Sequence, residues 1–261
     1  MKTPNDFGVR GLPPTHSELL DHLATQFVRN GWSIKTMHRL VMHSATYQQA
    51  SGHLSHVSNR TEGTDRTHET DLYAGFPPRR LSAEEIRDSI LFVSGELDTS
   101  PAREHPFPTP ISWGFTQHAP FSAVYDHNQR SVYLMAQRLK RHPFLALFDG
   151  PDPNATTADR LTTTVPTQAL FFLNDPFVHA KAEKWVARLL ANSSNERQQI
   201  EHAYRQAFGR TPTETEQADA TDFLAAYRTE LQSAKMDRVD VRALAAFLRT
   251  LFGSNEFLHV E

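Results

Sequence analysis

The stretch Arg130–Asn174, RSVYLMAQRLKRHPFLALFDGPDPNATTADRLTTTVPTQALFFLN, combines several local patterns on which the rest of the fold depends. Its beginning, Ser131 to Met135, has the β-branched and aromatic content of a strand. A short apolar run, an acidic turn rich in Pro and Gly, and a Thr-rich helix start follow. Polar side chains from separate elements can therefore converge in this stretch.

Downstream of this stretch, the sequence is typical of helices. Each expected helix opens on a residue that can cap its free amides or on a first-turn proline, and apolar residues then recur every three or four positions. The expected openings are Pro166, Asp175-Pro176, Ser193 with Glu196, Thr211-Pro212 with Glu214, and Asp240. Gly209 and Gly253 are expected to end two of these helices.

The same reasoning predicts three helices upstream, which open at Thr15 with Glu18, at Ser33, and at Ser82 with Glu85. The third should bury Ile86, Ile90, Leu91 and Val93 and end at Gly95. Residues 51–71 are polar and are expected to form a surface loop. Residues 99–128 are expected to form an ordered loop, anchored by Phe107, Trp113, Phe115 and Phe121.

The predicted fold class is therefore mainly α: a multi-helix globular module with a small β element near Ser131 to Met135 and long ordered loops. We expect one domain over residues 1–261. Its parts are the N-terminal helices with the polar loop (1–98), the loop and strand region (99–174) and the C-terminal helices (175–261).

Composition excludes several classes of protein. The 27 Lys and Arg against 30 Asp and Glu leave a net charge of −3, which does not favour nucleic acid or an anionic membrane as a partner. No apolar run reaches the roughly 18 to 20 residues of a membrane helix, and the N-terminus lacks a signal-peptide pattern. We therefore expect a soluble chain without membrane insertion. With no cysteine, the chain has no disulfide, no thiolate ligand and no attachment motif for c-type haem.

Familiar catalytic and metal-binding motifs are also absent from the sequence. It contains no nucleophile elbow, phosphate-binding glycine loop, dinucleotide fingerprint, zinc-protease motif or EF-hand loop. Two histidine pairs are close enough in sequence to be candidate metal ligands, His38 with His43 and His53 with His56. The first pair lies five residues apart, which separates the side chains by about 140° on a helix. The second lies in a polar loop without a neighbouring carboxylate, so no metal site is expected.

Asp149 and Asp152 in the FDGPDP turn are the main acidic candidates. Two carboxylates brought close together can act as an acid and a base or bind a cation. With Arg130 and Arg160 around the same cleft, they would form a catalytic or polysaccharide-binding site. Ordinary turn chemistry favours a simpler interpretation, in which each Asp caps a turn beside Gly or Pro.

Arginines can instead hold these carboxylates in buried pairs and pin loops to the helical core. The polar residues expected in such a structural network are Arg79, Arg80, Glu84, Asp88 and Asn174. The Thr162–Gln168 stretch can offer hydroxyls and helix amides to an anion or a sugar, but a helix cap is the more common use of such residues. Trp113, Phe115, Phe121 and Tyr125 can line a carbohydrate face or anchor their loop to the core.

Several motifs carry a resemblance to a known family. They occur in the order DFGVRGLPPTHSELLDHLATQF, GWSIKTMHRLVMHSATYQQAS, RRLSAEEIRDSILFVSGELD, FLALFDGPDPN and TTTVPTQALFFLNDPFV. Together they resemble the C-terminal domain of unknown function of large planctomycete proteins, which are typically exported and often carry a cytochrome-c-like domain upstream. The resemblance covers nearly the whole chain. It implies that the start of the domain is missing here, and that Thr157-Ala158-Asp159-Arg160 stands where relatives often have a Cys.

The resemblance implies a setting rather than a reaction. We expect a non-catalytic interaction or scaffold module, outside the cytoplasm in the periplasm or at the cell surface, although this chain carries no signal peptide. Expected partners are other domains of the parent protein or surface proteins, with polysaccharide as the alternative. No cofactor is expected in this chain, because haem would belong to the upstream domain.

Overall fold

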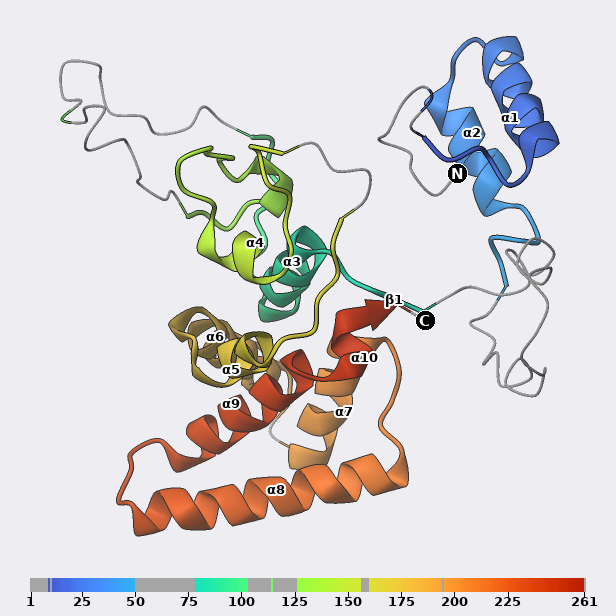
Figure 1. Ribbon diagram of the computed structural model, residues 1–261. Helices are drawn as coiled ribbons and strands as arrows, with labels where there is room; N and C mark the ends of the chain where they lie inside the picture. The colour runs from blue at the N-terminus through green and yellow to red at the C-terminus, as the bar shows by residue number, and fades with distance from the viewer. Residues whose placement is uncertain are drawn as a thin grey trace, which may run out of the picture. The chain divides into compact units, whose positions relative to one another are not determined.

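The computed structural model, shown in Figure 1, describes residues 9, 11–49, 78–102, 114, 126–155, 160–193 and 195–260. The chain divides into two compact units. The first comprises residues 1–79, 157–159 and 261, and the second comprises residues 80–156 and 160–260. The expectation of a single domain stays a prediction.

The first unit contains two helices, α1 (Ser17–Arg29) and α2 (Ile34–Met42), that pack against each other. The Ser33 hydroxyl accepts a hydrogen bond from the Thr36 amide, which confirms the predicted cap of α2. The cap predicted at Thr15 is wrong, since α1 follows His16 and has no side-chain cap. Neither helix buries a residue fully within the described part of the chain.

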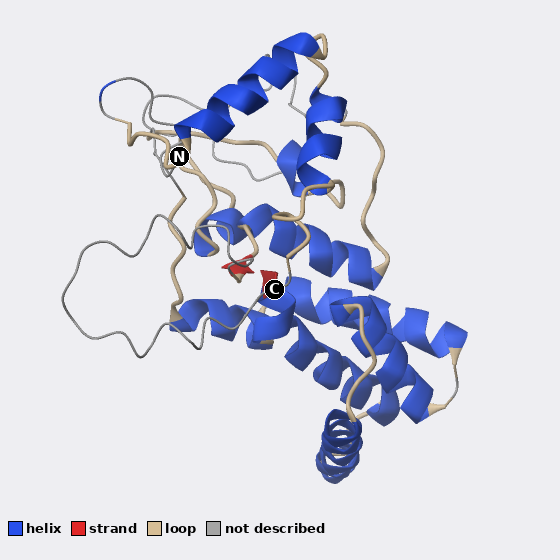
Figure 2. Cartoon of the chain, turned by 90° about the vertical axis from the view of Figure 1, so that its right-hand side faces the viewer, coloured by secondary structure: helices blue, strands red, loops and turns tan. Residues whose placement is uncertain are grey.

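The second unit is also mainly helical. Its elements are β1 (Arg79–Arg80), α3 (Ala83–Ser94), the 3-10 helix η3 (Ser131–Tyr133), α4 (Pro143–Leu147), α5 (Pro166–Asn174), α6 (Pro176–Asn192), α7 (Glu196–Phe208), α8 (Glu214–Ser233), α9 (Val239–Phe252), α10 (Asn255–Leu258) and β2 (His259–Val260). The strands β1 and β2 form a two-stranded sheet, red in Figure 2. The predicted fold class, mainly α with a small β element, is confirmed.

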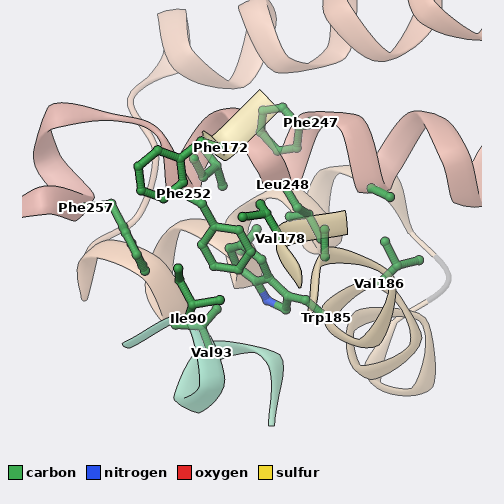
Figure 3. Close-up of a cluster of buried hydrophobic side chains, with 14 of the residues drawn as sticks. Ile90, Val93, Phe172, Val178, Trp185, Val186, Phe247, Leu248, Phe252 and Phe257 are labelled. Atoms are coloured by element: carbon green, nitrogen blue, oxygen red, sulfur yellow. The ribbon is translucent and has the colours of Figure 1, made fainter. Parts of the chain in front are cut away.

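The core of this unit is built on α6, which packs against both α3 and α9, while α9 also packs against α8. The residues of α6 that face the core recur at helical spacing, and Trp185, the largest of them, is fully buried. Its ring lies 4.9 Å from that of Phe252 on α9. Figure 3 shows Ile90, Phe172 and Phe257, from α3, α5 and α10, gathered around this pair. Burying each such side chain stabilises the fold by about 1.5 to 3 kcal/mol.

Most predicted helix starts and ends are confirmed. Ser82 and Glu85 form a reciprocal capping box at α3, and Gly95 closes it at φ 79°. Asp175 caps α6 through the Phe177 amide. Three other starts are displaced by one or two residues: α7 is capped by Asn195 instead of Ser193, α8 by Thr213 with Glu216 instead of Thr211 with Glu214, and α9 begins at Val239 instead of Asp240.

The predicted strand at Ser131 to Met135 is wrong, because Ser131–Tyr133 forms the 3-10 helix η3. The Asp88 carboxylate accepts hydrogen bonds from both the amide and the hydroxyl of Ser131, at 2.8 and 2.6 Å. These contacts hold the start of the segment against α3 and outweigh its β propensity. The small sheet forms instead between β1 and β2.

Two further expectations fall outside the described residues. They are the polar loop at 51–71 and the aromatic anchors of the 99–128 loop, Phe107, Trp113, Phe115, Phe121 and Tyr125.

Candidate functional site

The acidic turn follows directly after α4. Asp149 lies in the left-handed region at φ 61°, a conformation that Asp and Asn tolerate better than most residues. The Gly150 amide donates a hydrogen bond to the Leu145 carbonyl at 2.6 Å. A Cβ at position 150 would lie 2.7 Å from that carbonyl oxygen, so the turn requires Gly there.

The carboxylate of Asp149 contacts residues of two other segments of the chain. It accepts hydrogen bonds from the amide and the hydroxyl of Thr163, both at 2.8 Å. Arg80 lies 3.4 Å away and also donates to the Thr163 carbonyl. The side chains of Arg80 and Asp149 are only 8% and 16% exposed, and the guanidinium lies over the Phe148 ring. Asp149 therefore joins β1, the turn and the Thr-rich stretch.

The other three catalytic candidates lie in different local arrangements. Asp152 closes its own turn by accepting a hydrogen bond from the Asn154 amide at 2.9 Å. Arg160 forms an ion pair with Glu84 at the start of α3, at 2.6 Å. Arg130 is exposed and precedes η3. The predicted pairing of an arginine with Asp149 is thus found for Arg80, and Glu84 pairs with Arg160.

Of the polar network proposed from the sequence, Arg80, Glu84 and Asp88 each tie a loop or strand to another element. Arg79 lies in β1 and Asn174 ends α5, and both are exposed. The helix cap expected from the Thr-rich stretch is not found, since α5 follows Val165 without a side-chain cap hydrogen bond, and Thr163 donates to the Asp149 carboxylate instead. Gln168 ties the start of α5 to α4, because its side-chain amide donates a hydrogen bond to the Leu147 carbonyl at 2.9 Å.

Sequence reasoning missed Arg87, which is only 2% exposed on α3. Its guanidinium donates to the Ser131 hydroxyl and to the His127 carbonyl, so it holds the segment before η3. It also lies 5.7 Å from the Phe177 ring. Burial lowers the pKa of Arg87, while nearby Asp126 and Asp88 act in the opposite direction.

Lys181 on α6 forms a second buried cation that the sequence did not single out. Its ammonium pairs with Glu96 at 2.5 Å and contacts the Asn128 side chain at 3.3 Å. It also lies 5.4 Å from the Phe177 ring, so Arg87 and Lys181 share one aromatic neighbour. Both cations bind residues just before η3 and anchor that segment to α3 and α6.

A third polar cluster centres on Arg210, between α7 and α8. Its guanidinium bonds Glu216 through two nitrogens, at 2.8 and 2.6 Å, and Glu256 through two more contacts at 2.7 Å. The hydrogen bonds from Arg210 are the main reason why the pKa of Glu216 falls to about 2. The carboxylates in turn raise the pKa of Arg210 above its ordinary value. This cluster links α8 to α10.

None of these clusters has the form of a metal site. Among the described residues, no group of three or more His, Asp or Glu side chains is arranged to hold a metal ion. His38 and His43 are exposed on and just after α2, and His53 and His56 lie outside the described residues. A surface hollow between α7 and α8 is lined by Arg197, Glu214, Gln217, Ala218, Thr221 and Asp222 and includes none of the four catalytic candidates. In the described part of the chain, no helix is both long and apolar enough to cross a membrane.

These observations define a mainly helical protein whose charged side chains connect its segments. Residues 1–224 match the model of the PSD1 family, described as "Protein of unknown function (DUF1553)". Since the match covers most of the 261 residues, the chain belongs to this family. No curated protein and no solved structure matches the chain.

Proposed function

We propose that the chain is a non-catalytic interaction or scaffold module. The observation that carries this proposal is the state of Asp149, the strongest catalytic candidate in the sequence. A general base needs a carboxylate oxygen that can reach the proton of a substrate. Both oxygens of Asp149 already accept hydrogen bonds from Thr163, and one of them also faces Arg80.

The neighbouring carboxylates support the same proposal. Glu84 pairs with Arg160, and Asp88 accepts two hydrogen bonds from Ser131. Each of these contacts joins segments that are more than 40 residues apart in the sequence. A carboxylate used in this way fixes the position of a loop, which suits a protein that presents a surface to a partner.

The proposed setting is extracytoplasmic, as part of a large planctomycete protein with a cytochrome-c-like domain. Its support is the resemblance carried by motifs such as FDGPDPN and TTTVPTQAL. Other domains of that protein, or surface proteins, are the proposed partners, and haem would be bound by the upstream domain. Fractionation of the parent organism's cells, with antibodies against this chain, would test the location. Recovery with cytoplasmic markers would contradict it.

A thermal-shift screen tests the lack of catalysis and of ligand binding at Asp149. The wild-type chain and Asp149→Asn are screened against polysaccharides, anionic sugars and divalent cations. We expect no ligand to stabilise the wild type in a saturable manner, and we expect the substitution to lower the basal melting temperature. A saturable stabilisation that Asp149→Asn abolishes, with an unchanged basal melting temperature, would favour the alternative, a polysaccharide-binding or polysaccharide-acting domain.

A further inference from the structure

The surface hollow between α7 and α8 has the size of a small-molecule site. Its volume is about 460 Å³, and pockets that bind ligands typically measure about 300 to 1,000 Å³. Five of the lining residues come from α8, and Arg197 comes from the first turn of α7. All of them belong to the second unit. A molecule of the size of an amino acid or a sugar therefore fits this volume.

The α8 residues of the hollow share one face of the helix. Glu214, Ala218 and Asp222 form a row in which each residue follows the previous one by four positions. Cβ atoms four positions apart on a helix are separated by about 6 Å, so the Cβ atoms of Glu214 and Asp222 lie about 12 Å apart. Gln217 and Thr221 lie beside this row, on one side of it, at about 100° per residue. The row thus offers two carboxylates with a methyl group between them.

The charged side chains of the hollow do not hold the fold together. Within the described residues, Arg197, Glu214 and Asp222 form no ion pair and no side-chain hydrogen bond. The residue next to Arg197 behaves differently, because Glu196 pairs with Arg228 of α8 at 2.5 Å. The hollow therefore keeps one guanidinium and two carboxylates available to a ligand.

The positions and signs of these charges decide the class of ligand. A metal ion needs oxygen ligands within about 2.6 Å, so two carboxylates on Cβ atoms about 12 Å apart do not share one ion. A phosphate or another polyanion would be repelled by both carboxylates. No aromatic side chain is among the lining residues, so a sugar ring would have no face to stack on. A ligand with two cationic groups and one anionic group is complementary to all three charges.

We propose that the hollow binds an amino acid with two amino groups, such as lysine. Its ammonium groups pair with Glu214 and Asp222, and its methylene groups lie over Ala218. Its carboxylate pairs with Arg197, whose guanidinium can bind it through two nitrogens. An extended lysine with a hydrogen bond at each ammonium spans about 13 Å between the two acceptors, close to the spacing of the row. This site goes beyond the interaction role proposed above and does not depend on it.

Isothermal titration calorimetry of the full chain with L-lysine tests the proposal. L-Lysine is expected to bind in a saturable manner with a Kd below about 1 mM. Three probes each lack one of its charged groups. 1,5-Diaminopentane lacks the carboxylate, 6-aminohexanoate lacks the α-amino group, and L-norleucine lacks the side-chain ammonium. Each probe should bind at least about tenfold more weakly, because one charged hydrogen-bonded pair is missing.

Substitutions connect each group of the ligand to one residue. Arg197→Gln should weaken L-lysine binding at least about tenfold but should not weaken 1,5-diaminopentane, which has no carboxylate for Arg197 to bind. Glu214→Gln and Asp222→Asn should each weaken L-lysine binding at least about tenfold. Asp219→Asn is the matched control, since it removes an exposed carboxylate of α8 outside the hollow, and it should change the Kd by less than about twofold. Circular dichroism checks that every variant keeps its helices.

The absence of saturable binding of L-lysine up to about 10 mM would overturn the proposal. Equal affinities for L-lysine and 1,5-diaminopentane would also overturn it, because the carboxylate of the ligand would then have no partner in the hollow. The same holds if Asp219→Asn weakens binding as much as Asp222→Asn. In that case the acidic surface of α8 as a whole, and not the hollow, would attract the ligand.

Discussion

Replacing Asp149 by Asn tests the structural use of the acidic turn with little change of shape. Asn tolerates the left-handed backbone at φ 61°, so the turn itself is not strained. The Asn carbonyl oxygen can still accept from the Thr163 amide, which the carboxylate binds at 2.8 Å. What the substitution removes is the negative charge that faces Arg80 at 3.4 Å.

The expected cost follows from the burial of Arg80. Its side chain is 8% exposed, and its second terminal nitrogen has no hydrogen-bond partner among the residues that the structure describes. Removing one partner of a buried ion pair typically costs about 3 to 5 kcal/mol. The distance of 3.4 Å and the 16% exposure of Asp149 favour the lower end, about 3 kcal/mol. A unit of this size loses about 2 to 4 °C per kcal/mol, so the melting temperature should fall by about 6 to 12 °C.

The assay is thermal unfolding followed by circular dichroism, with Asp152→Asn as the matched control. Asp152 undergoes the same chemical change in the same turn, but within the described residues its side chain accepts only a local hydrogen bond from the Asn154 amide. Its substitution should cost less than about 1 kcal/mol, as for an ordinary turn or cap residue. If Asp149→Asn and Asp152→Asn melt within about 2 °C of each other, the Arg80 pair is not structural. The carboxylate of Asp149 would then be available for chemistry.

Three further predictions concern other parts of the second unit. Because the folded-state pKa of Glu216 is about 2 against an ordinary 4.5, its pair with Arg210 stabilises the fold above pH 4.5 and is lost as the pH falls towards 2. Because both side chains are about one third exposed, the stabilisation from this pair is discounted to about 1 kcal/mol. The free energy of unfolding of Arg210→Met, measured with urea, should lack this pH dependence between pH 5 and 2. A pH dependence equal to that of the wild type would contradict the pairing. Gly150→Ala should lower the free energy of unfolding by at least about 2 kcal/mol, since its Cβ would meet the Leu145 carbonyl oxygen at 2.7 Å. An unchanged melting curve would mean that the turn can shift. Ser82→Ala removes the α3 cap and should cost about 1 kcal/mol in the same unfolding assay, and a neutral result would show that the cap is dispensable.

Local chemistry was enough to predict the longer helices of this chain, whereas the short helices α4 and α10 were not predicted. Ser82 and Glu85 can bond each other's backbone amides only if a helix starts there, and Ile86 and Ile90 then necessarily face one side. The strand predicted at Ser131 failed for a reason outside its own sequence. Contacts of Ser131 with Asp88, 43 residues earlier, determine the backbone there, and such contacts follow from tertiary packing.

The polar clusters were only partly predictable. An arginine partner for Asp149 was expected, but the choice of Arg80 depends on where β1 lies relative to the turn. Arg87 and Lys181 were missed because Arg and Lys are rarely buried. A pattern was present nonetheless: Arg87 lies four residues after Ala83 and three before Ile90, within the buried stripe of α3. A cation at such a position indicates a buried partner.

The same clusters connect the fold to the proposed role. Arg87 and Lys181 hold the segment before η3, and Arg80 with Asp149 holds the Thr-rich stretch. Breaking any of these contacts would leave a buried charge without its partner, so each loop has one strongly preferred position. An enzyme that closes over a substrate needs loops that move. A binding module instead benefits from loops that are already ordered, because no conformational entropy is then lost in ordering them when the partner binds. The use of charge in this unit therefore favours a preformed interaction surface over catalysis.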